Sequence, residues 1–160
     1  MAAIGDVDEA NSAIGTALLH VVDKSVRAML QRIQNELFDL GADLATPGED
    51  FAPSEMVLRI VPGQIARLER EIDAMNEELE PLRSFILPAG EAGAAHLHLA
   101  RAIVRRAERS AVAAGQAVLL NPLALAYINR LSDHLFVAAR LAAKQEGGEI
   151  LWQPGATRGP

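Results

Sequence analysis

Three arginines lie within five residues in the second half of the chain, at Arg105, Arg106 and Arg109. On a helix, which turns about 100° per residue, Arg101, Arg105 and Glu108 share one line roughly a quarter turn from an apolar stripe. The planar guanidinium group fits phosphate oxygens through paired hydrogen bonds, so a polyphosphate is the natural ligand of such a cluster. An exposed helix face with ordinary Arg–Glu pairs has the same spacing, and the spacing alone favours that simpler interpretation.

A second helical face further along the chain carries Asn129, Asp133, Phe136 and Arg140, with aliphatic residues on the opposite side. Polar groups beside an aromatic ring on one helical line suit a cleft for a ligand that has both polar and flat apolar parts. A bundle surface with one half-buried phenylalanine fits the same pattern. Taken alone, the spacing again favours the surface over the cleft.

Acidic residues gather near the start of the chain, at Asp6, Asp8 and Glu9. Asp6 is a candidate N-cap of the first helix, with Glu9 completing a capping box. All three carboxylates could simply be acids that favour the positive end of a helix. If Asp8 has a function, it needs a cationic partner, and Arg101 is the partner that we expect.

Several kinds of catalytic site are excluded by what the sequence lacks. It has no cysteine, which excludes disulfides, thiolate nucleophiles and Cys-ligated zinc. It also has no phosphate-binding P-loop, no dinucleotide-binding glycine motif and no Glu-x-x-His pair. His96 and His98 are two residues apart on a predicted helix and point away from each other, so they cannot chelate one metal. We therefore predict no metal bound by side chains, and we expect His96, on the apolar side, to be a satisfied packing or surface group rather than a ligand.

Composition and periodicity predict which elements position these residues. The chain has 160 residues, half of them apolar and only 4% aromatic, which favours helices over a sheet built from β-branched and aromatic residues. Apolar residues repeat at three- and four-residue steps in five segments separated by Pro and Gly. These segments predict helices over about Val7–Val22, Lys24–Leu44, Pro62–Leu79, Ala94–Ala114 and Pro122–Lys144.

Five helices with short connections predict an all-α, five-helix antiparallel bundle in a single domain over residues 1–146, followed by a C-terminal tail over 147–160. The net charge of −6 and the pI near 5.2 argue against nucleic acid and anionic membranes as partners. No apolar run reaches the roughly 18 residues of a membrane span, and no signal peptide opens the chain, so we expect a cytoplasmic protein.

An ordered set of motifs resembles the PduO-type ATP:cob(I)alamin adenosyltransferases. The motifs run in order over nearly the whole chain, and the ordered set is far more specific than any single piece of it. They are Gly5-Asp6-Val7-Asp8-Glu9-Ala10-Asn11, Gln34-Asn35-Glu36-Leu37-Phe38, Phe85-Ile86-Leu87-Pro88, Leu97-His98-Leu99-Ala100-Arg101, Arg105-Arg106-Ala107-Glu108-Arg109, and Asn129-Arg130-Leu131-Ser132-Asp133 with Phe136 three residues on.

The resemblance implies a trimer-forming five-helix bundle, a homotrimer whose active sites lie between subunits. It implies that ATP, with Mg2+ on the triphosphate, and cobalamin bind side by side, and that Co(I) attacks the 5′ carbon of ATP. Adenosylcobalamin and triphosphate are the products, with a possible handover of the former to a B12-dependent enzyme.

The same resemblance assigns roles to particular residues. It implies that Arg101 pairs with Asp8 of a neighbouring subunit, and that Phe85 and Phe136 pack on the corrin and hold off its lower ligand. With Phe85, the Asp8–Arg101 pair would form the catalytic set. The ATP-binding set carried over from the motifs is Arg105, Arg106, Glu108, Arg109 and Asn129.

Two departures from the family pattern lead to further expectations. Ala89 follows Leu87-Pro88 where the family usually has Gly, so we expect a small change in that turn. The family's N-terminal nucleotide loop, Thr-Arg-Thr-Gly-Asp with a following lysine, has no counterpart in the sequence. We therefore expect an N-terminal extension of about two dozen residues carrying a phosphate-binding loop, which an intact-mass measurement would test. The missing loop also keeps open two alternatives, a non-catalytic cobalamin carrier or chaperone bundle with an incomplete ATP site, and an adaptor bundle with no small ligand.

Overall fold

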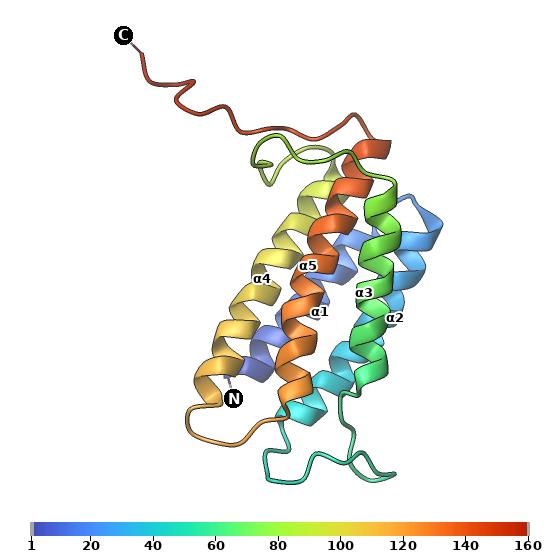
Figure 1. The fold of residues 1–160 in the computed structure, drawn as a ribbon, viewed down its shortest axis with the longest axis vertical. Coiled ribbons are helices and arrows are strands. Elements are labelled where there is room, and N and C mark those ends of the chain that lie inside the picture. Colours follow the sequence, from blue (N-terminus) through green and yellow to red (C-terminus); the bar gives the residue numbers. More distant parts are fainter. Residues whose placement is uncertain (1, 160) are drawn as a thin grey trace.

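The computed structural model describes residues 2–159 as a bundle of five α-helices (Figure 1). The helices are α1 (Ala2–Leu18), α2 (Lys24–Leu44), α3 (Pro62–Glu77), α4 (Ala92–Ala114) and α5 (Pro122–Gln145). Outside the helices, residues 2–159 form two isolated antiparallel bridges, Ser54 with Val57 and Ile86 with Leu151, and no strand. The all-α, five-helix prediction is confirmed.

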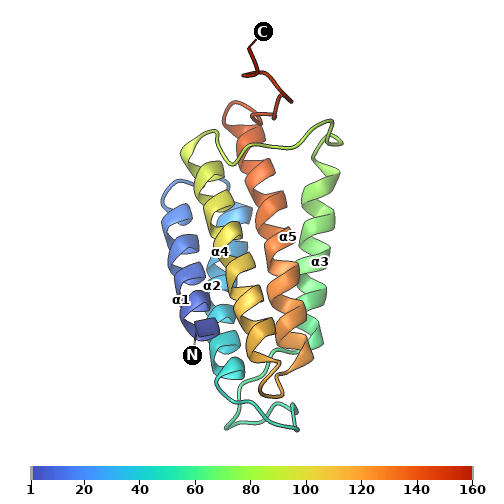
Figure 2. The same ribbon diagram turned by 90° about the vertical axis from the view of Figure 1, so that its left-hand side faces the viewer.

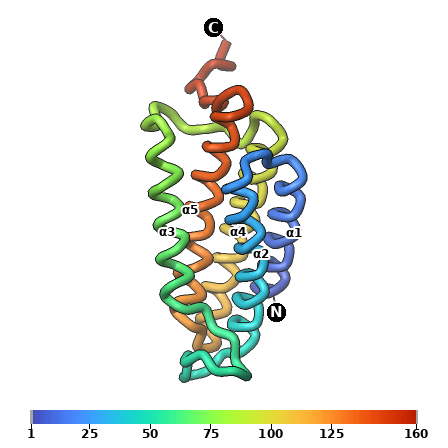
Figure 3. Tube along the Cα trace, turned by 90° about the vertical axis from the view of Figure 1, so that its right-hand side faces the viewer, coloured from blue at the N-terminus to red at the C-terminus, as the bar shows by residue number. Residues whose placement is uncertain are grey.

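Successive helices run in opposite directions, so the bundle is antiparallel in chain order (Figure 1). The packing order differs from the chain order, because α4 packs between α1 and α5, and α3 packs on α5. Figures 2 and 3 show α3 and α5 side by side, and these two neighbours run in the same direction. Two parallel helices must be joined by a connection that runs back along the bundle. Between α3 and α5, the loop over residues 78–91 and helix α4 over residues 92–114 provide this connection.

The core is built largely from alanine and aliphatic side chains. On α4, the predicted stripe is buried throughout, from Leu97 and Ala100 to Ala111. Alanines at such positions let neighbouring helices approach closely, because nothing beyond Cβ separates their backbones. Replacing Ala107, which is 1% exposed, with leucine would overpack this contact and cost about 1–3 kcal/mol.

Helix α1 begins earlier than its acidic residues predict. It starts at Ala2, so Asp6 and Glu9 lie inside the helix, and the expected N-cap and capping box at these residues are wrong. The physical reason is that Ala3, Val7 and Ala10 already form a buried face, which extends the helix back to Ala2. The helix also ends at Leu18 rather than near Val22.

The N-terminus of α2 has a clear side-chain cap. The carboxylate of Asp23 accepts hydrogen bonds from the backbone N–H groups of Ser25 at 2.8 Å and Val26 at 2.9 Å. Hydrogen bonds to the charged form, above all from the Ser25 side chain, lower the pKa of Asp23 to about 2. Asp23 therefore stays ionised, and keeps its cap, well into acid.

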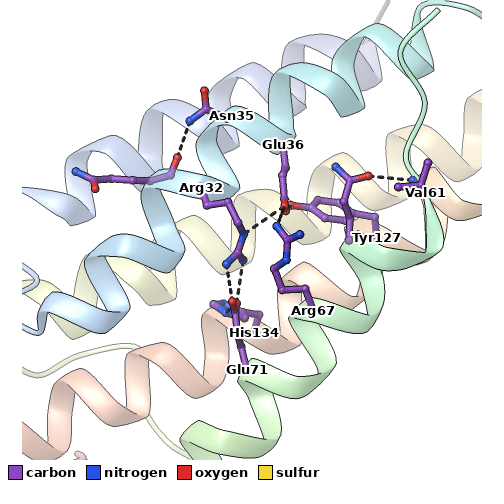
Figure 4. Close-up of polar contacts among 10 residues, drawn as sticks. Arg32, Asn35, Glu36, Val61, Arg67, Glu71, Tyr127 and His134 are labelled. Carbon is purple, nitrogen blue, oxygen red and sulfur yellow. Dashed lines mark hydrogen bonds and ion pairs between the residues drawn. The ribbon is translucent and has the colours of Figure 1, made fainter. Parts of the chain in front are cut away.

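Polar contacts hold α3 on the bundle, because only two of its residues, Leu68 and Met75, are fully buried. The carboxylate of Glu71 on α3 accepts hydrogen bonds from both terminal nitrogens of Arg32, at 2.5 and 2.9 Å. One of its oxygens also lies 2.9 Å from Nε2 of His134 (Figure 4). Burial alone would raise the pKa of Glu71, but the hydrogen bonds from His134 and Arg32 outweigh it and lower the pKa to about 2. Glu71 therefore joins α3 to α2 and α5 as a charged group.

A buried carboxylate on α2, Glu36, completes this polar layer (Figure 4). It accepts a hydrogen bond from the hydroxyl of Tyr127 at 2.7 Å, and it forms ion pairs with Arg32 at 3.2 Å and Arg67 at 3.1 Å. Burial, then the charge of Glu36, raises the pKa of Tyr127, so the hydroxyl remains a donor.

The long connection over residues 45–61 is fixed at the opposite end of the bundle from the α3–α4 connection (Figure 1). Arg59 pairs with the fully buried Asp43 at 2.7 Å and donates to the carbonyl of Thr46. The other carboxylate oxygen of Asp43 accepts two hydrogen bonds, one from the side-chain amide of Asn121 at 2.7 Å and one from the backbone N–H of Ile60 at 2.7 Å. Both carboxylate oxygens of the buried Asp43 therefore have charged or polar partners.

Candidate active site

A cleft of about 480 Å³ lies where the α3–α4 connection crosses α4 and α5. It brings together three residues that the sequence analysis assigned to the site: Arg101 on α4, Phe136 on α5 and Phe85 on the connection. The full lining is Leu82, Arg83, Ser84, Phe85, Ile86, His98, Arg101 and Phe136.

Arg101 is a half-buried cation next to an aromatic ring. Its guanidinium carbon lies 5.7 Å from the ring centre of Phe136, a cation–π contact. Among residues 2–159 it has no ion pair with a carboxylate, and its buried Nε has no hydrogen-bond partner. Burial, and then the neighbouring Arg105, lower the pKa of Arg101 below its ordinary value. Its surroundings within one chain favour an additional anionic or hydrogen-bond-accepting partner.

The two phenylalanines present flat apolar surface to the cleft. Phe136 is half-buried between α4 and α5, whereas the Phe85 side chain is 76% exposed. An exposed phenylalanine that contacts few apolar groups gains little from folding, so its position at the mouth of a cleft suits contact with a ligand better than packing.

His98 belongs to the same cleft, and the sequence analysis missed it. It is 3% exposed, its ring centre lies 6.2 Å from that of Phe136, and its buried Nδ1 has no partner among the residues described. Burial, and then the charge of Arg101, lower the pKa of His98, which keeps the imidazole neutral near pH 7. Its position three residues before Arg101, one helical turn away, was the available signal.

His96 is the less buried of the two histidines, and its ring has partners, as expected of a packing or surface group. It is half-buried, stacks on His20 at 4.8 Å between ring centres, and its Nδ1 lies 2.7 Å from the carbonyl of Ala92. His98 is the buried histidine because α4 packs against both α1 and α5. The buried face of α4 is therefore wider than one stripe and includes His98.

The arginine run continues from the cleft along α4. Arg105 and Arg109 are exposed, and Arg109 donates to the carbonyl of Arg105 at 3.0 Å. Glu108, between them, accepts a hydrogen bond from Nδ2 of Asn129 at 2.8 Å. The structure thus joins two residues that lie 21 positions apart in the sequence on the α4–α5 face that also carries Arg101.

Arg106 points to a different neighbour. It pairs with Asp6 at 3.2 Å and with Glu9, both on α1, and Ser110 donates to Asp6 at 2.5 Å. This guanidinium therefore joins α4 to α1, and the acidic residues at the start of the chain are its partners. That Arg106 also contacts ATP stays a prediction.

Asp8 lies apart from the cleft within one chain. It is exposed on α1 and lines a groove of about 480 Å³ between α1 and α2, together with Asn11 and Phe38. Phe38 is 72% exposed at this groove. One chain therefore does not bring Asp8 and Arg101 together, and the proposed pair requires a second copy.

The arrangement combines an aromatic cleft, one cation without an anion, and an exposed arginine run that leads away from it. These features suit a large flat ligand beside a polyanion. In residues 2–159 no three His, Asp or Glu side chains converge as a metal site. None of the five helices is long and apolar enough to cross a membrane.

Comparison with known proteins identifies the family of the chain. The sequence pattern of the family described as cobalamin adenosyltransferase matches residues 1–142. A corrinoid adenosyltransferase of Mycobacterium leprae is 48% identical over 160 residues, covering 97% of this chain and 83% of that protein. A cobalamin adenosyltransferase of Cupriavidus metallidurans is 44% identical, covering 94% of this chain and 79% of that protein.

The fold comparison gives the same family. The structure of a variant PduO-type ATP:corrinoid adenosyltransferase from Lactobacillus reuteri, complexed with cobalamin and ATP, superposes with a TM-score of 0.84 at 36% identity. The match covers 96% of this chain and 83% of that one. The chain therefore belongs to the cobalamin adenosyltransferase family.

Proposed function

We propose that this protein transfers the 5′-deoxyadenosyl group of ATP to Co(I) of cobalamin, giving adenosylcobalamin and triphosphate. The single observation that carries the proposal is the cleft that joins Phe85, Phe136 and Arg101 and continues into the arginine run of α4. The relatives above are named adenosyltransferases, and one was captured with both substrates, so the comparisons do not favour the carrier alternative.

In this reaction the protein forms no covalent bond with either substrate. The electron pair of Co(I) attacks the 5′ carbon, the C5′–O bond breaks, and the triphosphate leaves with the bonding pair. Cobalt becomes Co(III) with a bond to carbon, so no side-chain nucleophile is needed. The protein must place the 5′ carbon in line with cobalt, stabilise charge on the leaving group and exclude water.

For the triphosphate, the exposed guanidinium groups of Arg105 and Arg109 are the natural ligands. Glu108 and Asn129 lie between the two arginines and α5, and their hydrogen bond fixes the spacing of the two helices there. A magnesium ion on the triphosphate is bound mainly by phosphate oxygens and water, and Glu108 is the carboxylate that lies within the arginine run in the sequence. Arg106 contributes by holding α4 against α1.

For the corrinoid, Phe85 and Phe136 supply flat apolar surface at the cleft. An apolar ring against the lower face of the corrin keeps water and the lower ligand away from cobalt. Removing that ligand eases reduction to Co(I), because the electron pair then occupies an orbital with no ligand donating into it. A corrin that fills the cleft excludes water and so strengthens each remaining electrostatic contact of Arg101.

We also propose a homotrimer of cytoplasmic subunits, each with its bundle domain over residues 1–146 and its tail over 147–160, and with active sites between subunits. Two features support the assembly: Arg101 has no carboxylate partner among residues 2–159, and Asp8 and the exposed Phe38 line a groove on another face. Pairing of Asp8 with Arg101 of a neighbour would satisfy both charges. Handover of the product to a B12-dependent enzyme is part of the same proposal.

The test is a spectroscopic assay under anaerobic reducing conditions. Cob(I)alamin and MgATP are mixed with the protein, and the absorbance change of cobalt–carbon bond formation is followed. We expect adenosylcobalamin only when both substrates are present, and a loss of rate in the Arg105→Lys variant. Binding of both substrates without any cobalt–carbon bond would support the carrier alternative instead.

A further inference from the structure

The C-terminal tail pairs with the segment that carries Phe85. The backbone N–H of Leu87 donates to the carbonyl of Ile150 at 2.8 Å, and that of Trp152 donates to the carbonyl of Phe85 at 2.8 Å. Ile86 and Leu151 form an antiparallel bridge between these two contacts. Figure 1 shows the tail leaving α5 beside this connection. Phe85 is therefore held by main-chain pairing with the tail.

Side chains reinforce the pairing at the same place. The hydroxyl of Ser84 donates to the carbonyl of Trp152 at 2.8 Å. The rings of Phe85 and Trp152 meet edge to face, with their centres 5.9 Å apart. Because the side chain of Phe85 is 76% exposed, these contacts, and not burial in the core, determine where its ring points.

One nearly buried arginine anchors both paired segments. Arg140, near the end of α5, pairs through Nε with Glu149 of the tail at 2.6 Å and donates through Nη2 to the carbonyl of Glu80 at 2.8 Å. Glu80 lies at the start of the connection that carries Phe85. The tail turns back from α5 to reach this anchor through Gly147 and Gly148, both at positive φ, which glycine adopts without strain.

We propose that Arg140 is a positioning residue for the corrinoid, acting through Glu149 and the tail to hold Phe85 over the cleft. The proposal rests on the proposed function, since it assumes that Phe85 contacts the corrin. Arg140 itself does not line the cleft. The Arg140 side chain is 8% exposed, so its pairing with Glu149 is poorly screened, and removing Glu149 leaves the charge of Arg140 buried.

The sole tryptophan of the sequence, Trp152, reports on the tail directly. Its fluorescence is measured without ligands in the wild type, in Glu149→Ala and in Arg140→Met, with Arg130→Met as the matched control. Arg130 is also on α5 and pairs with Asp133 and Glu69, away from the tail. We expect a red shift and easier quenching in the first two variants, because Trp152 leaves the Phe85 ring for water, and no change in the control.

The dissociation constant of cob(II)alamin with MgATP bound provides the second measurement, and it does not depend on adenosyl transfer. Loss of a charged hydrogen bond predicts a constant raised about tenfold in Glu149→Ala and Arg140→Met, with unchanged MgATP affinity. We also expect a smaller four-coordinate fraction in the electron paramagnetic resonance spectrum. Glu149→Ala changes only the partly exposed tail, so it keeps the test valid if Arg140→Met fails to fold.

Three outcomes would overturn the proposal: an unchanged Trp152 emission, an unchanged corrinoid affinity despite released tails, or an equal loss of MgATP affinity. Failure of the proposed function looks different. The wild type would then form no adenosylcobalamin, while the fluorescence and cob(II)alamin binding of the variants would still show whether Arg140 positions the tail and the cleft.

Discussion

The guanidinium of Arg101 lies over the ring of Phe136, 5.7 Å from its centre, and joins the α4 and α5 walls of the cleft. The described part of the chain, residues 2–159, provides no carboxylate partner for Arg101. A cation that is half-buried and desolvated gains most from a carboxylate brought by another molecule, and Asp8 is the candidate on the neighbouring copy.

Pairing of Asp8 with Arg101 between subunits predicts energetic coupling in trimer assembly. Asp8→Ala and Arg101→Ala should each weaken assembly, and the double variant should cost less than their sum by about 1.5 kcal/mol or more. Sedimentation equilibrium measures all four proteins. Asp73→Ala, which changes an exposed acid on α3, should simply add to Arg101→Ala. Additivity of Asp8→Ala with Arg101→Ala would reject the pair, and a wild-type monomer at micromolar concentration would reject the trimer.

Substitution of Arg105 by lysine tests whether this residue binds ATP or the corrinoid. Lysine keeps the charge but loses the planar pair of donors that fits a phosphate. We expect the KM for ATP to rise about tenfold or more, with little change in the KM for the corrinoid. Steady-state kinetics with each substrate varied in turn provides the comparison. A selective rise in the corrinoid KM would place Arg105 beside the corrin.

Removal of the Phe85 ring should damage the corrinoid step. In Phe85→Ala, water or the lower ligand reaches cobalt, so the four-coordinate Co(II) signal in the electron paramagnetic resonance spectrum should decrease strongly while ATP still binds. Phe85→Leu, which keeps an apolar side chain, should retain part of the signal. A full-strength four-coordinate signal in Phe85→Ala would remove Phe85 from the mechanism.

His98 predicts a pH dependence of stability. Its pKa is lowered in the folded protein, mainly by burial and then by Arg101, although Glu149 opposes part of this effect. The unfolded chain therefore takes up the proton first as the pH falls through the ordinary histidine pKa of about 6.5. The free energy of unfolding should decrease below that pH, by at most about 1.4 kcal/mol per unit from this group.

The measurement is denaturant unfolding at pH 7.5 and pH 5.5 in the wild type and in His98→Gln. We expect the wild type to lose more stability between the two conditions, because glutamine takes up no proton. His20→Gln serves as the control, since His20 is exposed. An equal loss in the wild type and His98→Gln would mean that His98 is already protonated or freely hydrated in the folded state.

The helices could be predicted from the sequence because apolar periodicity and Pro or Gly breakers act locally. Pro62 and Pro122 begin α3 and α5 as predicted, and the stripe from Leu97 to Ala111 is buried. The start of α1 could not be predicted, because burial of Ala3 against the other helices extends the helix past its local signals.

The site was predictable in part, and the missing parts all depend on tertiary contacts. Helical periodicity placed Arg101 beside the core. It could not show the pairing of Arg106 with α1, because that pairing requires the packing of α4 on α1. His98 was missed since its burial depends on a second neighbour of α4. The pairing of the tail with Phe85 joins residues far apart in the sequence, and no local pattern encodes it.

In the proposed reaction, the 5′ carbon of ATP becomes bonded to cobalt while the triphosphate leaves intact. ATP labelled with carbon-13 at the 5′ position, mixed with cob(I)alamin and the wild-type protein, tests it directly by carbon and phosphorus nuclear magnetic resonance. We expect the labelled resonance to move from the phosphate-ester region to that of carbon bonded to cobalt, and free triphosphate to appear in equal amount. A label that stays in the ester region, or phosphate and diphosphate in place of triphosphate, would contradict it.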